Sequence, residues 1–385
     1  MNAAQWAGLI AALMVAANLV CLSIAFVRLR RKQAPSRLQK QAPPVTIVRP
    51  VRGIETFSRE TLTSGLELDY PQYETIFCVA DGHDPIVPLI EELIATYGAD
   101  RVRLIVGDVA VSANPKLNNC VKGWEAARHD WVILADSNVL MPKDYVQRLM
   151  ASWREDTGLV CSTPAGSRPG CFGAEVECAF LNTFQARWQY AGEALGFGFA
   201  QGKSMLWNKP FLDANGGIAA LAAEIAEDAA ATKLVRKAGK HVHLVGQPFE
   251  QPLGPRALRD VVQRQFRWAR LRRVTFLPFF APEILVGPLV PAVLAAIGAP
   301  AFGFPAWLGA FLIYAWMGVV LNVFPVFARD ELRLPESSVG LVLTVRAIAT
   351  AIGFYLLSRL TFWQYRRGVI IALSIGSALA QIGRA

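Results

Sequence analysis

An aspartate at the end of an apolar run is the first residue in this chain whose position suggests chemistry. Asp136 follows Trp131-Val132-Ile133-Leu134-Ala135 and precedes Ser137-Asn138. A carboxylate at the mouth of a buried strand can hold a hard divalent cation, Mg²⁺ or Mn²⁺, against a phosphorylated ligand. Because the same pattern also marks an ordinary boundary between strand and loop, the hypothesis depends on what accompanies Asp136.

Three other groups of polar residues could complete such a site. Asp81 ends a second apolar run, Glu227-Asp228 lies far downstream, and residues 264–268 read Arg-Gln-Phe-Arg-Trp. Transfer of a group from a diphosphate-bearing donor to a hydroxyl acceptor fits these residue types. The diphosphate charge must be offset by a cation and by basic side chains such as Lys116, and the hydroxyl needs a carboxylate base.

The elements that must position these residues alternate between strand and helix, which predicts an α/β fold with a doubly wound, mostly parallel sheet. Ligands of such sheets bind at the carboxyl ends of the strands, where Asp81 and Asp136 both fall. Residues 197–207, with glycines at 198 and 202, are expected to form a bent strand or loop against the ligand. Strands are expected at 45–51, 73–81, 101–106, 131–134, 158–163 and 241–245, and helices at 55–67, 88–97, 117–127, 175–190 and 224–238.

The composition predicts a membrane component, because 53% of the residues are hydrophobic and the mean hydropathy is +0.32. Residues 6–27 carry no charge and are followed by Arg28, Arg30, Arg31 and Lys32. A cleaved signal peptide is the other interpretation, but no basic region precedes this long apolar stretch. We therefore expect a retained anchor with its basic flank, and the domain after it, on the cytoplasmic side.

Five regions are expected: an anchor at 1–27, a basic juxtamembrane linker at 28–44, the α/β domain at 45–260, an amphipathic helix at 261–281 and membrane helices at 282–385. Residues 261–281 mix arginines with aromatics, which suits a helix in the headgroup plane more than a solvated basic face.

Further apolar segments lie at 284–301, 304–327, 339–357 and 369–379. If the first three each crossed the bilayer, Arg359, Arg366 and Arg367 would lie outside, against the positive-inside rule. Either the proline-rich first segment does not span, or the third is re-entrant.

The net charge of +9 favours an anionic partner, either a bilayer surface or a nucleotide-bearing substrate. A nucleic-acid partner is disfavoured, because no recognised nucleic-acid motif accompanies the charge. The six cysteines form no Cys-x-x-Cys pair and no cluster of zinc spacing, which indicates reduced thiols.

Seven short motifs follow one another between about residue 45 and residue 280. They are Arg49-Pro-Val-Arg-Gly53, Glu67-Leu-Asp-Tyr-Pro71, Cys78-Val-Ala-Asp81, Asn114-Pro-Lys-Leu-Asn-Asn119, Asp136-Ser-Asn138, Ile225-Ala-Glu-Asp228 and Arg264-x-x-Arg267-Trp268. Singly these motifs are weak signals, but together they are specific, and they resemble those of the ceramide glucosyltransferases, the family 21 glycosyltransferases, whose catalytic core has the GT-A fold. The resemblance implies a membrane-bound inverting enzyme that moves a hexose, glucose above all, from a UDP-sugar to the primary hydroxyl of ceramide.

The resemblance also implies roles for the three acids. Asp81 would contact the uridine, Asp136 would bind a divalent ion that bridges the donor diphosphate, and Asp228 would take the proton from the acceptor hydroxyl. Each has an ordinary alternative: Asp81 as a helix N-cap, Asp136 as a strand boundary, and Glu227-Asp228 as charges that complement a helix dipole.

For the basic segment, the resemblance implies that Arg267 and Trp268 close over the diphosphate and the acceptor entrance, with Arg264 assisting. Trp268 as an interfacial anchor is the alternative. Lys116 as a contact to the diphosphate or nucleotide is our own inference from its charge, and a solvated lysine is equally compatible.

The chain departs from the family pattern at two places. Asp136-Ser137-Asn138 lacks the second acid of Asp-x-Asp, and Gln185-Ala-Arg187 stands where eukaryotic members have His-Pro-Arg. These departures bear on metal binding and on acceptor recognition.

Two other functions stay open. The acceptor could be a hopanoid-associated lipid or diacylglycerol, or the chain could be a scaffold that binds anionic lipids. A processive polysaccharide synthase is disfavoured because few membrane helices follow the domain. We expect an integral protein of the bacterial inner membrane whose catalytic domain is cytoplasmic.

Overall fold

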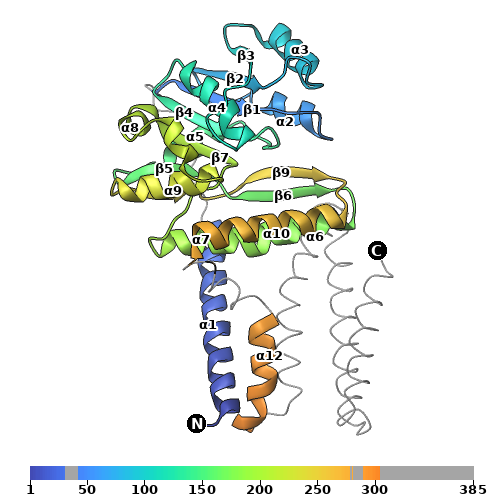
Figure 1. Cartoon of the computed structure of the whole chain (residues 1–385), viewed down its shortest axis with the longest axis vertical. Helices are drawn as coiled ribbons and strands as arrows, with labels where there is room; N and C mark the ends of the chain where they lie inside the picture. The colour runs from blue at the N-terminus through green and yellow to red at the C-terminus, as the bar shows by residue number, and fades with distance from the viewer. Residues whose placement is uncertain (31–41, 278–279, 281–288, 304–385) are drawn as a thin grey trace. The chain divides into compact units, whose positions relative to one another are not determined.

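The computed structural model of the chain describes residues 1–30, 42–277, 280 and 289–303 (Figure 1). The chain divides into two compact units, Met1–Trp316 and Met317–Ala385, and all the described residues belong to the first unit. Most of the linker and the apolar segments expected at 304–327, 339–357 and 369–379 lie outside the described residues.

A seven-stranded sheet in the order β3-β2-β1-β4-β7-β5-β8 forms the centre of the α/β domain. Four strand pairs are parallel, whereas β7 runs antiparallel to both of its neighbours, β4 and β5, so the predicted mostly parallel sheet is confirmed. The strands are β1 (Val45–Pro50), β2 (Tyr73–Val79), β3 (Val102–Val106), β4 (Trp131–Ala135), β5 (Thr157–Cys161), β7 (Ser204–Asn208) and β8 (His241–Leu244).

Helices cover both faces of this sheet, as predicted for a doubly wound fold. Every residue of β1 and β2 is buried, as expected for parallel strands with two covered faces. Val48 and Ile76 face α4 (Pro115–Glu125), and α9 (Glu227–Lys237) contacts β8 and joins the same core cluster. Phe77 faces α2 (Ser58–Ser64) and α3 (Val87–Tyr97). α5 (Tyr145–Ala151) packs on the face with Ile47, and α8 (Lys209–Ala214) and the 3₁₀ helix η2 (Ile218–Ala223) follow β7.

A second, two-stranded sheet was not expected from the sequence. β6 (Pro164–Pro169) pairs in parallel with β9 (Phe249–Gly254), and both strands contain proline and glycine, residues that usually argue against strands. The helix expected at 175–190 is longer and has three parts, namely α6 (Phe172–Ala179), the π-helical turn η1 (Phe180–Gln185) and α7 (Ala186–Ala194).

The basic segment expected at 261–281 forms α10 (Leu258–Thr275), which packs against α6. Glu177 of α6 is fully buried and pairs with Arg264 Nη1 at 2.6 Å and with Arg256 Nε at 3.3 Å. Gly173 lets the two segments approach, because a Cβ there would collide with the Arg256 carbonyl. A buried carboxylate needs such partners, so this pairing fixes α10 on α6.

The N-terminal helix α1 (Ala3–Arg30) contains the predicted anchor and is, among the described residues, the one helix long and apolar enough to cross a membrane. Its end contacts α7, since Arg28 forms an ion pair with the buried Glu193, donates to the Leu244 carbonyl at 2.6 Å and stacks on Tyr190. α12 (Leu289–Gly298), followed by the 3₁₀ helix η3 (Ala299–Phe302), lies within the apolar segment expected at 284–301.

The close packing of α4 on the sheet yields a first prediction. A Cβ on Gly123 would collide with Val48 and lie 2.8 Å from Cys78 Sγ. Gly123→Ala should therefore lower the stability by about 1–3 kcal/mol through overpacking, although alanine is the better helix former by about 1 kcal/mol. Thermal unfolding of the purified protein measures this, and Glu125→Ala on the exposed side of α4 is the control. A raised melting temperature for Gly123→Ala would show that α4 sits further from the sheet.

Candidate functional site

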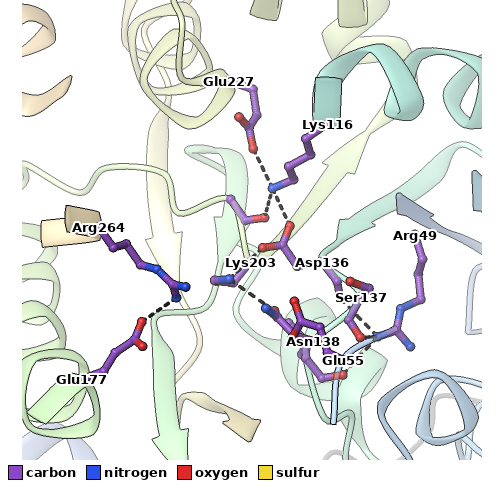
Figure 2. A network of polar contacts seen from close by, with 12 residues as sticks. Arg49, Glu55, Lys116, Asp136, Ser137, Asn138, Glu177, Lys203, Glu227 and Arg264 are labelled. Atoms are coloured by element: carbon purple, nitrogen blue, oxygen red, sulfur yellow. Dashed lines mark hydrogen bonds and ion pairs between the residues drawn. The ribbon is translucent and has the colours of Figure 1, made fainter. Parts of the chain in front are cut away.

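A lysine between two carboxylates forms the centre of the candidate site (Figure 2). Lys116 Nζ lies 2.6 Å from Asp136 Oδ1 and 2.6 Å from Glu227 Oε1, and it donates to the Gly202 carbonyl at 2.5 Å. Burial lowers the pKa of Lys116, but the charges of Asp136 and Glu227 raise it well above its usual value. Lys116 is therefore a permanent cation that joins segments distant in sequence.

The start of α4 positions Lys116. The side chain of Asn114 caps this helix by accepting from the Lys116 backbone NH at 3.0 Å, and Pro115 occupies the first turn. Asn114 Nδ2 also donates to Glu227 Oε2 at 2.6 Å. Lys116 and Asn114, at the start of α4, therefore contact one Glu227 carboxylate oxygen each, and the N-termini of α4 and α9 lie together.

Asp136 follows the last residue of β4 and forms an ion pair with a second lysine. Lys203, which precedes β7, places Nζ 2.9 Å from Asp136 Oδ2 and donates to Asn138 Oδ1 at 3.3 Å. Burial raises the pKa of the Asp136 carboxyl, but Lys116 and Lys203 lower it more, to about 2. Asp136 is thus ionised at any physiological pH.

A buried arginine shapes the turn after Asp136. Arg49 in β1 is fully buried, and its Nη2 donates to the carbonyl groups of Asp136, Ser137 and Val139 at 3.1, 2.9 and 3.1 Å. Burial lowers the pKa of Arg49 to about 10, so the guanidinium stays charged. Backbone carbonyls held in this way leave the side chains of the turn free to face the ligand.

Asp228 is the acid of this site with a strongly raised pKa. Burial is the main cause, the neighbouring charge of Glu227 adds to it and Lys116 opposes it, so the pKa rises from 3.8 to about 6. A carboxylate that titrates near neutral pH can accept a proton from a reacting hydroxyl. Glu227 takes the ion pair with Lys116, which leaves Asp228 as the carboxylate available for proton transfer.

Asp81 lies at the same edge of the sheet but makes no hydrogen bond or ion pair with these residues in the described part of the chain. It is exposed, its Oδ1 accepts from the His83 NH at 2.9 Å, and β1 separates its strand from β4. The N-cap of α3 is Ile86, so Asp81 is not a helix cap. Asp84 instead orders the neighbouring loop by accepting from the NH groups of Gly53 and Ile86.

The residues predicted on α10 stand apart from the lysine cluster. Arg264 is held by Glu177, as Figure 2 shows, and Arg267 is exposed. Trp268 packs on Ala174, Leu181 and Leu253. Within the described residues, no hydrogen bond or ion pair links these three to Asp136 or Asp228.

No roles were expected from the sequence for Asn114, Lys203 and Arg49. The signal available for Lys203 was its place in the glycine-interrupted segment 197–207, which was expected to lie against a ligand. A Cβ at Gly202 would lie 2.7 Å from Glu227 Oε1 and 2.8 Å from Lys116 Nζ, so a larger residue there would have to displace one of these two ion-paired side chains. The buried Arg49 lies in a motif quoted above, but nothing in its spacing indicated contact with the turn after Asp136.

The oxygens near Asp136 suit a hard cation. Asp136 Oδ2 and Asn138 Oδ1 both accept from Lys203 Nζ, so the two oxygens already face one positive charge. No group of three or more His, Cys, Asp or Glu side chains able to hold a metal occurs among the described residues. A magnesium-type ion often takes one or two protein ligands and completes its shell with substrate phosphates and water, which these oxygens allow.

Two of the curated relatives are ceramide glucosyltransferases. The chain is 27% identical to ceramide glucosyltransferase 3 of Caenorhabditis elegans over 274 residues, which are 71% of this chain and 58% of the relative. It is 25% identical to ceramide glucosyltransferase 1 of the same organism over 306 residues, 79% of this chain and 64% of the relative. The alignments thus span less than two thirds of either relative.

The fold resembles that of a solved glycosyltransferase. A mannosyltransferase from Pyrobaculum calidifontis, determined with GDP-Man and Mn²⁺, aligns with 82% of this chain and 92% of its own at a TM-score of 0.50 and 16% identity. At that identity the likeness concerns the fold alone, and it agrees with the GT-A-like fold expected from the sequence.

The sequence model of glycosyl transferase family 21 matches residues 10–362, which is most of the chain and includes the α/β domain with its lysine cluster. The chain therefore belongs to glycosyl transferase family 21.

Proposed function

We propose that the protein is a membrane-bound inverting glycosyltransferase that moves a hexose, glucose in the first place, from a UDP-sugar to the primary hydroxyl of ceramide. One observation carries the proposal. Next to a cluster of two lysines around an ionised aspartate lies Asp228, a half-buried acid with a pKa of about 6. Family membership and the names of the relatives supply the substrate class.

The donor would bind at the lysine cluster. Lys116 and Lys203 converge on Asp136, so their ammonium groups can turn from that carboxylate to the oxygens of a diphosphate. Asp136 and Asn138 would hold a divalent cation, which when bound offsets the charge of the diphosphate and of the leaving nucleotide. Asp81, on the same edge of the sheet, is proposed to contact the uridine.

The acceptor would react beside Asp228. This carboxylate takes the proton of the hydroxyl, the hydroxyl oxygen forms a bond to C1 of the sugar, and the bond between C1 and the phosphate oxygen breaks. UDP leaves with the bonding electron pair, and the direct displacement inverts the anomeric centre. Because the pKa of about 6 lies near the working pH, Asp228 is ionised yet basic enough to accept the proton.

The residues of α10 are proposed to act at the entrance. Arg264, Arg267 and Trp268 would approach the diphosphate and the acceptor, and the Glu177 pairing supports this by holding α10 to the domain. The resemblance supplies the roles of these three residues.

The proposal includes where the protein lies in the cell. α1 would cross the bacterial inner membrane and leave the α/β domain on the cytoplasmic side, where nucleotide sugars are available; its basic end at Arg28 and Arg30 supports that orientation. Lipid and nucleotide sugar, rather than nucleic acid, account for the positive charge.

The proposal is tested by incubating the purified protein in detergent with UDP-glucose, UDP-galactose, UDP-glucuronate and a UDP-N-acetylhexosamine, each with ceramide or diacylglycerol. Mass spectrometry of the lipids should show hexosylceramide, with less product after chelation by EDTA and recovery on addition of Mg²⁺ or Mn²⁺. Glycosylated diacylglycerol without glycosylated ceramide would favour the alternative lipid transferase. A scaffold would bind no UDP.

Asp228→Asn is expected to reduce turnover by at least about a thousandfold, because the amide cannot accept the proton. In the unmodified protein, kcat/KM should fall about tenfold per pH unit below about pH 6, as the Asp228 carboxyl becomes protonated. UDP titration by calorimetry should show donor binding unchanged in the variant. Near-normal turnover of Asp228→Asn would refute the base assignment.

The same substitution should stabilise the fold at neutral pH. Because the folded pKa of about 6 exceeds the usual 3.8, the neutral acid favours folding below about pH 4, and that contribution is lost as the pH rises through 6. Asp228→Asn removes a half-buried charge, so its melting temperature should exceed that of the unmodified protein at pH 7.5 and approach it at pH 4.5. Glu91→Gln on the exposed side of α3 is the control, and a lower melting temperature for Asp228→Asn at pH 7.5 would contradict the prediction.

Lys116→Met should weaken UDP binding by about 10–100-fold, the range expected for the loss of one charged contact. Lys143→Met, at an exposed lysine away from the cluster, should leave binding unchanged. Calorimetry with UDP measures both variants, and circular dichroism verifies that they are folded. A UDP affinity within twofold of normal for folded Lys116→Met would remove Lys116 from the donor site.

A further inference from the structure

An apolar stripe runs along the rod formed by α6, η1 and α7. Phe172 and Phe180 are 53% and 41% exposed, and Val176 between them is half-buried. Phe184 and Trp188, also half-buried, continue the same four-residue spacing. Large apolar side chains that are exposed in a row mark a contact surface more often than isolated ones do.

The π-helical turn keeps this stripe on one side of the rod. In an α-helix four residues exceed one turn by about 0.4 residue, so a four-residue spacing drifts around the axis. η1 covers Phe180–Gln185, and a π-turn closed by i→i+5 hydrogen bonds is wider. The four residues from Phe180 to Phe184 therefore make up less than one full turn. This compensates, at the middle of the rod, for the rotation that accumulates along the α-helical parts.

The neighbouring helix α10 carries a similar exposed stripe together with positive charge. Leu258, Val262 and Phe266, four residues apart, are 45%, 44% and 64% exposed. The exposed charged residues of α10 are four arginines and one aspartate: Arg259, Arg267, Arg270, Arg273 and Asp260. Apolar residues beside arginines suit the boundary between acyl chains and anionic headgroups.

The position of α1 connects these helices with a bilayer. The end of the one described helix able to cross a membrane is tied to α7 through Arg28 and Glu193. Figure 1 shows α6, α7 and α10 beside each other across the end of α1, with β6 and β9 on the other side. Elements at the end of a spanning helix that run across it lie at the depth of the headgroups.

We infer that the rod α6–η1–α7 is a membrane-contacting element in its own right, which inserts Phe172, Val176 and Phe180 into the bilayer beside α10. The stripe contacts an anionic bilayer at the boundary between its headgroups and its acyl chains. The inference rests on the proposed membrane location, not on the reaction catalysed. It gives the rod a role in presenting a lipid acceptor to the α/β domain.

Depth measurements on the full-length protein in nanodiscs of phosphatidylcholine and phosphatidylglycerol test the inference. Nitroxide labels are placed at Phe172→Cys and Phe180→Cys after Cys171→Ser and Cys178→Ser, with Glu91→Cys on α3 as the aqueous control. Oxygen should reach the two rod labels better than a water-soluble nickel complex does, and the control should show the reverse. Nickel access at the rod equal to that at residue 91 would overturn the inference, whatever the enzyme transfers.

A second arm asks whether the contact matters for the acceptor. Phe172→Ser/Phe180→Ser should raise KM for a long-chain acceptor in the bilayer by about tenfold, with KM for a detergent-dispersed short-chain acceptor and the affinity for UDP unchanged. Glu175→Gln, exposed on the same helix, is the matched control and should change neither KM. Equal losses for both acceptors would mean that the phenylalanines support the fold rather than bilayer contact. If no acceptor is glycosylated, the proposed function fails while the depth measurement still decides the location of the rod.

Discussion

A half-buried ammonium group between two carboxylates is the interaction on which the candidate site depends. Lys116 Nζ touches Asp136 at the end of β4, Glu227 at the start of α9 and the carbonyl of Gly202 before β7. Each of these groups would be costly to shield from water alone. A charge removed from water loses hydration free energy, and only a charged or hydrogen-bonding partner offsets that loss. Their joint burial therefore makes the three segments close on one another.

The antiparallel strand β7 supplies the second half of this arrangement. In a purely parallel sheet, the strand next to β4 would bring its carboxyl end to the site. Because β7 runs in the opposite direction, its amino-terminal approach, Gly202-Lys203, reaches Asp136 instead. A glycine at position 202 leaves the ion pair in place, since a Cβ there would lie 2.7 Å from Glu227 Oε1 and 2.8 Å from Lys116 Nζ. The direction of β7 thus accounts both for the second lysine and for the close approach of Gly202 to Lys116 and Glu227.

The buried Glu177 has a comparable role at the other side of the domain. Two arginines, Arg256 and Arg264, form ion pairs with it and hold α10 along α6. This pairing uses a residue of the Arg-x-x-Arg-Trp motif for packing, while Arg267 faces outward. A family motif on an amphipathic helix can therefore combine residues that fix the helix with residues available to a ligand or a lipid surface.

The sequence alone determined the alternation of strands and helices and the apolar N-terminal helix, because local hydrophobic periodicity carries that information. Its short motifs also predicted Asp136 and Asp228 as site residues. It could not determine the β6–β9 sheet, whose prolines and glycines oppose strand formation locally, nor the direction of β7. Only the tertiary structure decided that Glu227 would take the ion pair and leave Asp228 with a raised pKa. Adjacent acids look equivalent in a sequence, and they differ only once burial and a lysine from another helix act on them unequally.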